Sequence, residues 1–345
     1  MTTFLSIIGA LLLLTLFVAV HELGHYAAGR LLGFGILEFA IGMGPVVFKR
    51  VKNGIQYSLR ALPLGGMCRF YGEDEAVPEG ASPMVPFNGQ KVWKRAIVVA
   101  AGPFMNILLA LVFAAICLGV FGDYAAQVQA FSFENSPAEA AGVQMGDMIY
   151  AIDGERLLSY SEAVPAIRAA DGEALEITVL REGRKVDLTL RDVYNAEAGY
   201  NLIGVNIGVA RRTYTFFEAI GDCFGYVWAI VREMVQAIGR MFATGVQEGD
   251  LMGPVGTISV MSELVRYGWE TILRMAVLIS VNLGILNILP LPALDGGRLL
   301  FMAIEGVRGK AIRPETEGMI HFVGLILLFG LVIVLTIQDV RGLFG

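Results

Sequence analysis

Cysteine is scarce in this sequence of 345 residues, and acidic residues outnumber basic ones only slightly. Its three cysteines, Cys68, Cys117 and Cys223, are far apart and show no C-x-x-C spacing, so they predict neither a disulfide framework nor a cysteine metal site. The net charge of −6 gives no indication of nucleic-acid binding. Because no basic residue precedes the first long apolar segment, we expect that segment to be retained rather than removed as a signal peptide.

Apolar residues are abundant. They make up 55% of the chain, and the mean hydropathy of +0.63 is typical of a multi-pass membrane protein. A membrane helix needs about 20 consecutive apolar residues. Four segments come close to this length, which predicts an α-helical membrane protein with about four transmembrane helices: about Phe4 to beyond His21, Ala96 to Phe121, the stretch after Arg274, and Met319 to Ile337.

Lysine and arginine predict the orientation of these helices. Nine of them lie between Tyr26 and Arg95, together with only five acidic residues. Cytoplasmic loops carry an excess of Lys and Arg, so we expect this loop in the cytoplasm and the N-terminus outside. The long segment after the second apolar segment is then extracytoplasmic.

That segment contains a soluble α/β module at residues 126–210. The stretch SPAEAAGVQMGDMIYAIDG, Ser136 to Gly154, followed by two alternating strand patterns, resembles a PDZ domain. PDZ domains bind an extended peptide by adding a strand to a sheet edge. Peptide recognition and steric exclusion of bulky substrates both remain open for this module.

Between the module and the third apolar segment, Thr215 to Phe242 has apolar residues at helical spacing, interrupted by five charged residues. This pattern favours an amphipathic helix on the outer membrane surface over a fifth buried helix. The expected organisation is therefore membrane core at 1–125, PDZ domain at 126–210, membrane-surface region at 211–268 and membrane core at 269–345.

Two of the chain's three histidines lie in the sequence HELGH, at the end of the first apolar segment. His21 and His25 are four residues apart, so a helix places them on one face, with Glu22 beside them. This is the H-E-x-x-H arrangement of zinc proteases, in which the glutamate is the general base. A catalytic zinc also needs a third protein ligand and an open position.

Asp295 is the expected third ligand. It is the only acid in NILPLPALDGG, where Pro290 and Pro292 interrupt a helix. His21 lies about 17 residues into the first segment, and Asp295 lies about 20 residues after Arg274. At a helical rise of about 1.5 Å per residue, both are roughly 25–30 Å from the outer face of the membrane, near the cytoplasmic face. The alternative is an aspartate that only caps a helix.

Four motifs, in this order, resemble the site-2 protease family of intramembrane zinc metalloproteases, most of all the bacterial regulator-of-sigma-E proteases: HELGH, AGPFMN at 101–106, GPVG at 253–256 and NILPLPALDGG at 287–297. The resemblance implies that His21, His25 and Asp295 bind Zn2+ and that Glu22 is catalytic. This chain departs from the best-known relative because it has room for one PDZ domain, whereas that relative has two. Arg298 also replaces a histidine, for which we expect little consequence.

A transmembrane substrate must be held extended, because a helix hides its peptide bonds. The stretch Gly54 to Gly66 alternates and turns like a hairpin. If it dips into the membrane, its edge could pair with an unwound substrate, with Tyr57 and Leu59 as candidate contacts. The family resemblance supports this role, and a backbone-binding role for Asn287. The alternative is a peripheral cytoplasmic ribbon.

The expected function is an intramembrane endopeptidase of the bacterial inner membrane that cleaves single-span membrane proteins, such as an anti-sigma factor or remnant signal peptides. The expected partners are these substrates, membrane lipid, and a peptide or substrate tail at the PDZ domain. A catalytically silent PDZ scaffold is the first alternative, and a transporter or metal channel is the second. His321 is expected to be an interfacial histidine, although it could compete as a ligand.

Overall fold

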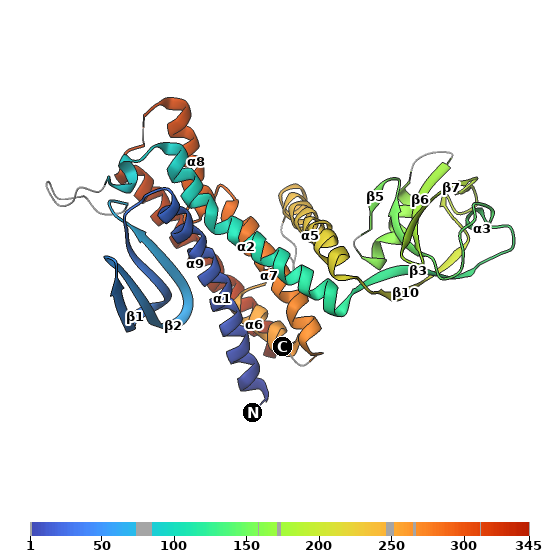
Figure 1. The fold of residues 1–345 in the computed structure, drawn as a ribbon, viewed down its shortest axis with the longest axis horizontal. Coiled ribbons are helices and arrows are strands. Elements are labelled where there is room, and N and C mark those ends of the chain that lie inside the picture. The colour runs from blue at the N-terminus through green and yellow to red at the C-terminus, as the bar shows by residue number, and fades with distance from the viewer. Residues whose placement is uncertain are drawn as a thin grey trace. The chain divides into compact units, whose positions relative to one another are not determined.

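The chain folds into two compact units. The computed structural model describes residues 2–73, 85–157, 159–170, 174–245, 252–264, 267–310 and 312–344 (Figure 1). The first unit comprises residues 1–114 and 230–345, and the second comprises residues 115–229.

Long apolar helices dominate the first unit. Four helices in the described part of the chain are long and apolar enough to cross a membrane. The third begins at Trp269, five residues before Arg274, and within its first turns Arg274 pairs with Glu270 at 3.1 Å. The four helices are α1 (Thr2–Leu31), α2 (Val92–Phe121), α7 (Trp269–Ile288) and α9 (Pro314–Phe344).

Glycines allow three of these helices to approach closely. A Cβ at Gly24 of α1 would overlap the carbonyl of Ala101 in α2, and one at Gly284 of α7 would lie 2.8 Å from Ile107 Cδ1. Small residues are the usual means by which membrane helices pack backbone to backbone. The α1–α2–α7 contact therefore depends on these two positions.

A β-hairpin follows α1, formed by β1 (Ile36–Lys52) and β2 (Ile55–Phe70). Its turn is Asn53–Gly54, where both residues have positive φ (53° and 79°), as a two-residue hairpin turn requires. The stretch Gly54–Gly66, predicted to contain a whole hairpin, instead contributes most of one strand. The prediction was wrong because the Asn-Gly turn signal lies at the start of that stretch.

Both strands of the hairpin bend, so that they form a ribbon four segments wide. Residues 36–41 pair with residues 56–59 on one side and with residues 66–70 on the other, while residues 46–52 pair with 55–60. Residues 66–70 thus form one edge of the ribbon, and residues 55–59 lie inside it.

The GPVG motif begins α6 (Pro254–Leu264), and its glycines have a structural explanation. Asp339 of α9 accepts backbone N–H groups of Gly253 at 3.2 Å and Gly256 at 2.8 Å. A Cβ at Gly256 would lie 2.8 Å from the same carboxylate. The aspartate therefore satisfies N–H groups at the start of α6 that the helix itself leaves unpaired.

The second unit is built on a six-stranded sheet with the order β10-β3-β4-β6-β7, in which β5 also pairs with β4. Its core consists of inward-facing residues such as Val128, Ile149 and Leu175, with short helices packed against the sheet. The elements are β3 (Asp123–Phe131), α3 (Pro137–Ala140), β4 (Met148–Ile152), β5 (Glu155–Arg156), α4 (Ala163–Ala169), β6 (Ala174–Arg181), β7 (Arg184–Arg191), β8 (Tyr194–Asn195), β9 (Tyr200–Asn201) and β10 (Val205–Arg212).

The SPAE sequence of this unit is a helix start. Ser136 caps α3 by accepting the N–H of Glu139 at 3.2 Å, and the Glu139 carboxylate accepts the N–H of Asn135 at 2.9 Å. Eight residues later, Asp147 is almost fully buried and accepts two hydrogen bonds from Arg181, at 2.9 and 2.7 Å. The motif that resembles PDZ domains thus encodes a helix start with reciprocal side-chain caps and the buried acidic partner of Arg181.

A long helix, α5 (Phe216–Thr244), follows the sheet. Phe216, Phe224 and Trp228 are 72%, 60% and 68% exposed. Near its start, Asp222 pairs with Arg212 at 3.0 Å and with Arg156 at 3.3 Å. The helix is therefore tied to the sheet by ion pairs while it leaves a row of large apolar side chains uncovered.

Candidate metal centre

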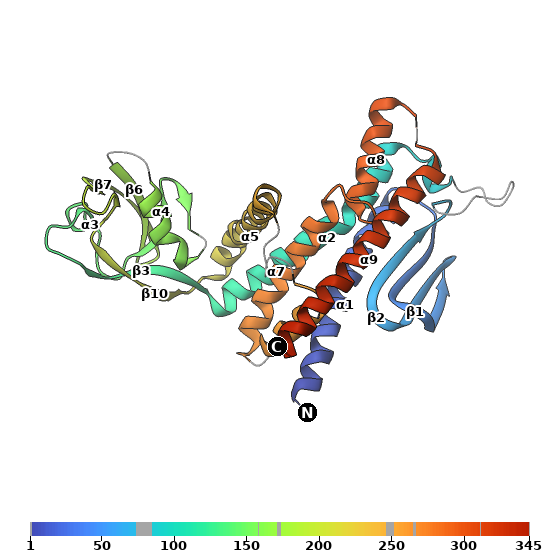
Figure 2. The same cartoon turned by 180° about the vertical axis from the view of Figure 1, so that it is seen from behind.

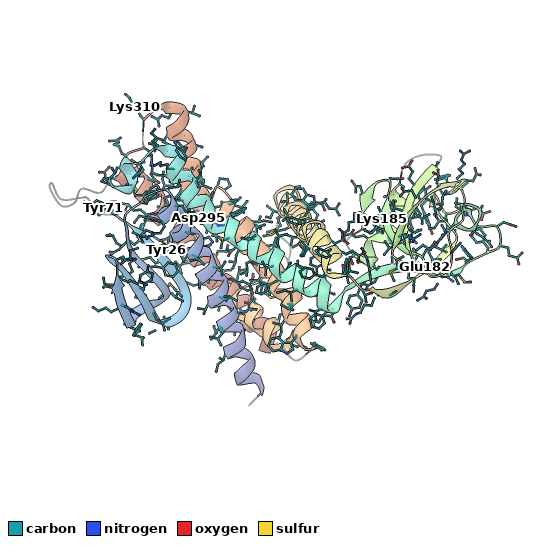
Figure 3. All side chains as sticks on the ribbon, viewed as in Figure 1. Tyr26, Tyr71, Glu182, Lys185, Asp295 and Lys310 are labelled. Carbon is teal, nitrogen blue, oxygen red and sulfur yellow. The ribbon has the colours of Figure 1, made fainter. Side chains whose placement is uncertain are left out.

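Three potential metal ligands converge within the first unit, where Figure 3 shows Asp295 among the helices. His21 Nε2 and His25 Nε2 are 3.2 Å apart, and Asp295 Oδ2 lies 3.0 Å and 3.4 Å from them. Their side chains are only 11–18% exposed. Among the described residues these three form the one group of His, Cys, Asp and Glu side chains arranged to hold a metal ion.

Helix α1 supplies two of the three donors, and the segment after the break between α7 and α8 supplies the third. His21 and His25 face one way because they are one turn apart on α1. Asp295 is the first residue of α8 (Asp295–Arg308), and α7 ends at Ile288, before the two prolines. The next two residues, Gly296 and Gly297, lack side chains. A Cβ at either position would overlap a backbone carbonyl of the segment between α7 and α8.

The donor geometry fits a tetrahedral zinc ion. With bonds of about 2.0–2.1 Å, two ligand atoms of such an ion lie about 3.3–3.4 Å apart, close to the observed 3.0–3.4 Å. Asp295 Oδ2 is buried and, among the described residues, has no hydrogen-bond partner of good geometry. A bound cation would satisfy this oxygen, so the residues present fit the metal.

The other ring nitrogens are held by α2, which orients both imidazoles. His25 Nδ1 lies 2.9 Å from the carbonyl oxygen of Val98, which can only accept, so Nδ1 carries the proton and Nε2 offers its lone pair. His21 Nδ1 lies 3.3 Å from Asn106 Nδ2, and the buried Oδ1 of the same amide has no partner among the described residues, so we exchange the oxygen and nitrogen of this amide. With that oxygen turned toward Nδ1–H, His21 too offers Nε2.

The sequence motif AGPFMN did not by itself indicate a role for these α2 residues. Asn106 is fully buried, and its carbonyl accepts the Ser280 hydroxyl at 2.7 Å. Gly102 lies against both imidazoles, because its Cβ would overlap His25 Nε2 and lie 2.8 Å from His21 Cε1. An asparagine inside an apolar helix was the available signal, since polar groups there are usually functional.

Glu22 lies on the side of the cluster that faces the hairpin. A Cβ at Gly66 of β2 would lie 2.7 Å from Glu22 Cγ, and the backbone of Cys68 is within hydrogen-bonding reach of the carboxylate. The carboxylate is therefore held between the metal cluster and the edge segment of the ribbon.

A family model described as Peptidase family M50 matches residues 9–331. The chain belongs to this peptidase family. Zinc metalloprotease RasP of Geobacillus kaustophilus is 31% identical over 98% of this chain and 98% of that protein, and RasP of Shouchella clausii is 29% identical over the full length of both. The resemblance to site-2 proteases is thereby confirmed.

One solved structure, the PDZ domain of an SdrC-like protein from Listeria innocua, matches 26% of this chain and 99% of its own, with 22% identity and a TM-score of 0.22. At that score it adds no argument about the fold. The PDZ interpretation of this M50 peptidase therefore rests on the sequence motif.

The remaining predicted site residues lie elsewhere in the M50 chain. Tyr57 shares a hydrogen bond with Tyr26 at 2.7 Å, and Leu59 is 49% exposed. Each pairs with β1 on both sides, Tyr57 with Phe39 and Arg50 and Leu59 with Ile41 and Phe48. Neither offers the unpaired edge that the prediction required, because the bent ribbon encloses them. The edges of the ribbon are residues 46–52 and 66–70, so the expected edge position is wrong, while substrate contact by the Tyr57 and Leu59 side chains stays a prediction.

Asn287 lies in the last turn of α7 and is half-buried, with no side-chain hydrogen bond to the described residues. His321 is separate from the three donors, and its Nδ1 accepts the N–H of Ala293 at 2.9 Å. Arg298, predicted to matter little, pairs with Glu73 at the end of the hairpin.

Gly102→Ala should disturb the metal cluster without removing a ligand. The added methyl group would push His25 and His21 apart, so we expect metal affinity to fall at least about tenfold, as changes around metal ligands commonly cause. Elemental analysis after dialysis against a chelator measures this. Gly9→Ala on α1 is the matched control, since no atom lies within 4 Å of its Cβ. Equal metal retention in the two variants would contradict the close packing.

Proposed function

We propose that this M50 peptidase is an intramembrane zinc endopeptidase that cleaves transmembrane segments of single-span membrane proteins. The observation that carries the proposal is the triangle of His21, His25 and Asp295 donors beside Glu22, formed by helices apolar enough to lie in a membrane. Relatives that match it almost end to end are named zinc metalloproteases.

His21, His25 and Asp295 would hold the zinc ion, which when bound lowers the pKa of a coordinated water to about 7 and polarises the scissile carbonyl. Glu22 removes a proton from the attacking water at its carboxylate and delivers it to the leaving amine. Val98 and Asn106 keep the two imidazoles in the tautomers that ligation requires.

The edge of the ribbon would hold the substrate extended. Residues 66–70 lie at that edge and Gly66 contacts Glu22, so a strand added there would pass beside the catalytic carboxylate. Backbone groups of an unwound substrate need partners in lipid, and this edge and the Asn287 amide supply them. The metal cluster and the binding surface are thus neighbours.

The metal test uses purified full-length protein. Wild type should hold about one zinc per chain, Asp295→Ala should lose most of it, and Glu22→Gln should keep it while cleavage falls by at least about 100-fold, because only the proton transfer is removed. Elemental analysis and cleavage of a single-span substrate measure both. Wild type that holds no zinc and cleaves nothing would contradict the proposal and favour a silent scaffold, whereas full cleavage by Glu22→Gln would show that Glu22 is not the catalytic base.

We infer four membrane-spanning helices, with the hairpin on the cytoplasmic side and the sheet of the second unit outside. The Lys and Arg content of residues 26–95 supports this orientation. The bacterial inner membrane is the corresponding location.

Cysteine labelling tests this orientation. In a variant whose native cysteines are alanine, Lys52→Cys at the hairpin turn should react only with reagents that enter the cytoplasm, and Arg184→Cys at the β6–β7 turn only from outside. Both side chains are exposed, so accessibility to the reagent depends on the side of the membrane. The reverse labelling would overturn the orientation.

We infer that the second unit carries a PDZ domain at residues 126–210 that limits access by substrates with bulky external domains. The domain would lie outside the membrane, whereas the zinc site is proposed to lie near the cytoplasmic face, so the domain supplies no zinc ligand. The segment from α5 to residue 268 would lie on the membrane surface, which its exposed Phe216, Phe224 and Trp228 support.

Excision of the domain tests this role. Asp123 and Arg212 are opposite each other in the β3–β10 pair, so residues 124–211 can be replaced by a short Gly-Ser linker. Cleavage of a substrate already trimmed to a short external stub should be largely unchanged, and cleavage of the untrimmed parent should increase severalfold. A folded, zinc-loaded deletion variant that cleaves neither form would show that the domain delivers substrate instead of excluding it.

A further inference from the structure

The segment that carries Asp295 rests on α9 at two points. In Figure 2, α9 lies on the near side of the first unit, and Gly324 is the only buried residue among its described side chains. One turn earlier, His321 is 19% exposed. Both residues face the segment between α7 and α8.

His321 contacts that segment on both sides of Asp295. Its Nδ1 accepts the N–H of Ala293, two residues before Asp295, at 2.9 Å. A Cβ at Gly297, two residues after Asp295, would lie 3.3 Å from His321 Cε1. The ring also packs edge-on against Phe301, one turn further along α8, with centroids 5.4 Å apart.

The hydrogen bond supports a strained backbone. Ala293 has φ of 74°, a left-handed conformation that an alanine adopts only when its surroundings hold it there. An amide can only donate, so Nδ1 is the unprotonated nitrogen of His321. Loss of this acceptor would leave the Ala293 N–H without a partner and remove a reason for the strained conformation.

Gly324 is the second point of contact. A Cβ there would overlap Pro292 Cβ and lie 2.9 Å from Pro292 C, so the absence of a side chain is what allows this close approach. Beside these two contacts the segment and α9 are separated by open pockets: one of about 330 Å³ between Ala293–Asp295 and Phe322, and one of about 490 Å³ between Leu291–Leu294 and Ile320. The contacts with α9 therefore fix this segment.

We propose that His321 and Gly324 are positioning residues that hold the Pro292–Ala293 segment on α9 and thereby keep Asp295 directed at His21 and His25. The inference rests on the proposed zinc peptidase function. Asp295 is the only one of the three donors outside α1, so the separation between the donors depends on how the segment is seated. His321 acts through the backbone and is not a ligand.

The experiment uses full-length protein and three measurements: zinc affinity by chelator competition, kcat and KM for a single-span substrate, and the melting temperature of the zinc-free protein. His321→Leu removes the acceptor, and His321→Asn restores one, because Asn Oδ1 occupies nearly the position of Nδ1. Gly324→Ala forces the segment away without touching His321. Gly330→Ala and Thr336→Val are matched α9 controls, because nothing lies within 4 Å of Gly330 and Thr336 bonds only its own helix.

We expect His321→Leu and Gly324→Ala to weaken zinc binding about 10- to 100-fold, the range seen when groups supporting a metal ligand are lost. Their kcat should fall while KM and the zinc-free melting temperature change little. His321→Asn should recover most of the affinity, and both controls should match wild type.

Wild-type zinc affinity in His321→Leu and Gly324→Ala would overturn the inference. A second result would also overturn it: His321→Leu loses zinc affinity, His321→Asn does not recover it, and Gly324→Ala binds zinc like wild type. The imidazole itself would then be needed for zinc binding. If wild type binds no zinc, the proposed function fails first, and that result is distinct from either of these.

Discussion

The site depends on one constraint: a carboxylate must reach two histidines inside a bundle of apolar helices. His21 and His25 are fixed relative to each other by α1, but Asp295 is 270 residues further along the chain than His25. It reaches them because α7 ends before Pro290 and because α1, α2 and α7 pack at glycines. An ordinary side chain at Gly24 or Gly102 would separate the helices or displace the imidazoles, and the three donors would no longer form a triangle.

The motifs that identify the family have distinct physical roles in this chain. HELGH supplies two donors and the carboxylate of Glu22. In AGPFMN, the glycine admits the imidazoles and Asn106 orients one of them. In GPVG, the backbone is open to the carboxylate of Asp339. In LDGG, the two glycines allow α8 to start against the carbonyls of the connecting segment. HELGH also contains Gly24, which lies against the Ala101 carbonyl of α2, so all four motifs include a glycine that permits close approach.

The hairpin shows that the sequence can predict an element without predicting which of its residues lie at an edge. The alternating pattern indicated a β-ribbon next to the first helix, and such a ribbon is present. Which of its residues lie at an edge depends on how the strands bend, and bending is set by the pairing of residues 36–41 with two partners. Tyr57 and Leu59 are enclosed by this pairing, whereas Gly66 lies at the edge and against Glu22. No period in the sequence distinguishes these positions.

The sequence by itself determined the apolar helices, the inserted α/β module, the two histidines on one helical face and the break before Asp295. Each of these follows from local composition or spacing: the length of an apolar run, a period of 3.6 residues, or the missing N–H of proline. The tertiary structure alone decided which α2 groups orient the imidazoles, which strand edge meets Glu22, and that His321 bonds the Ala293 backbone instead of joining the donors. These contacts join residues far apart in the chain, and they depend on interhelical distances that glycine permits but does not specify.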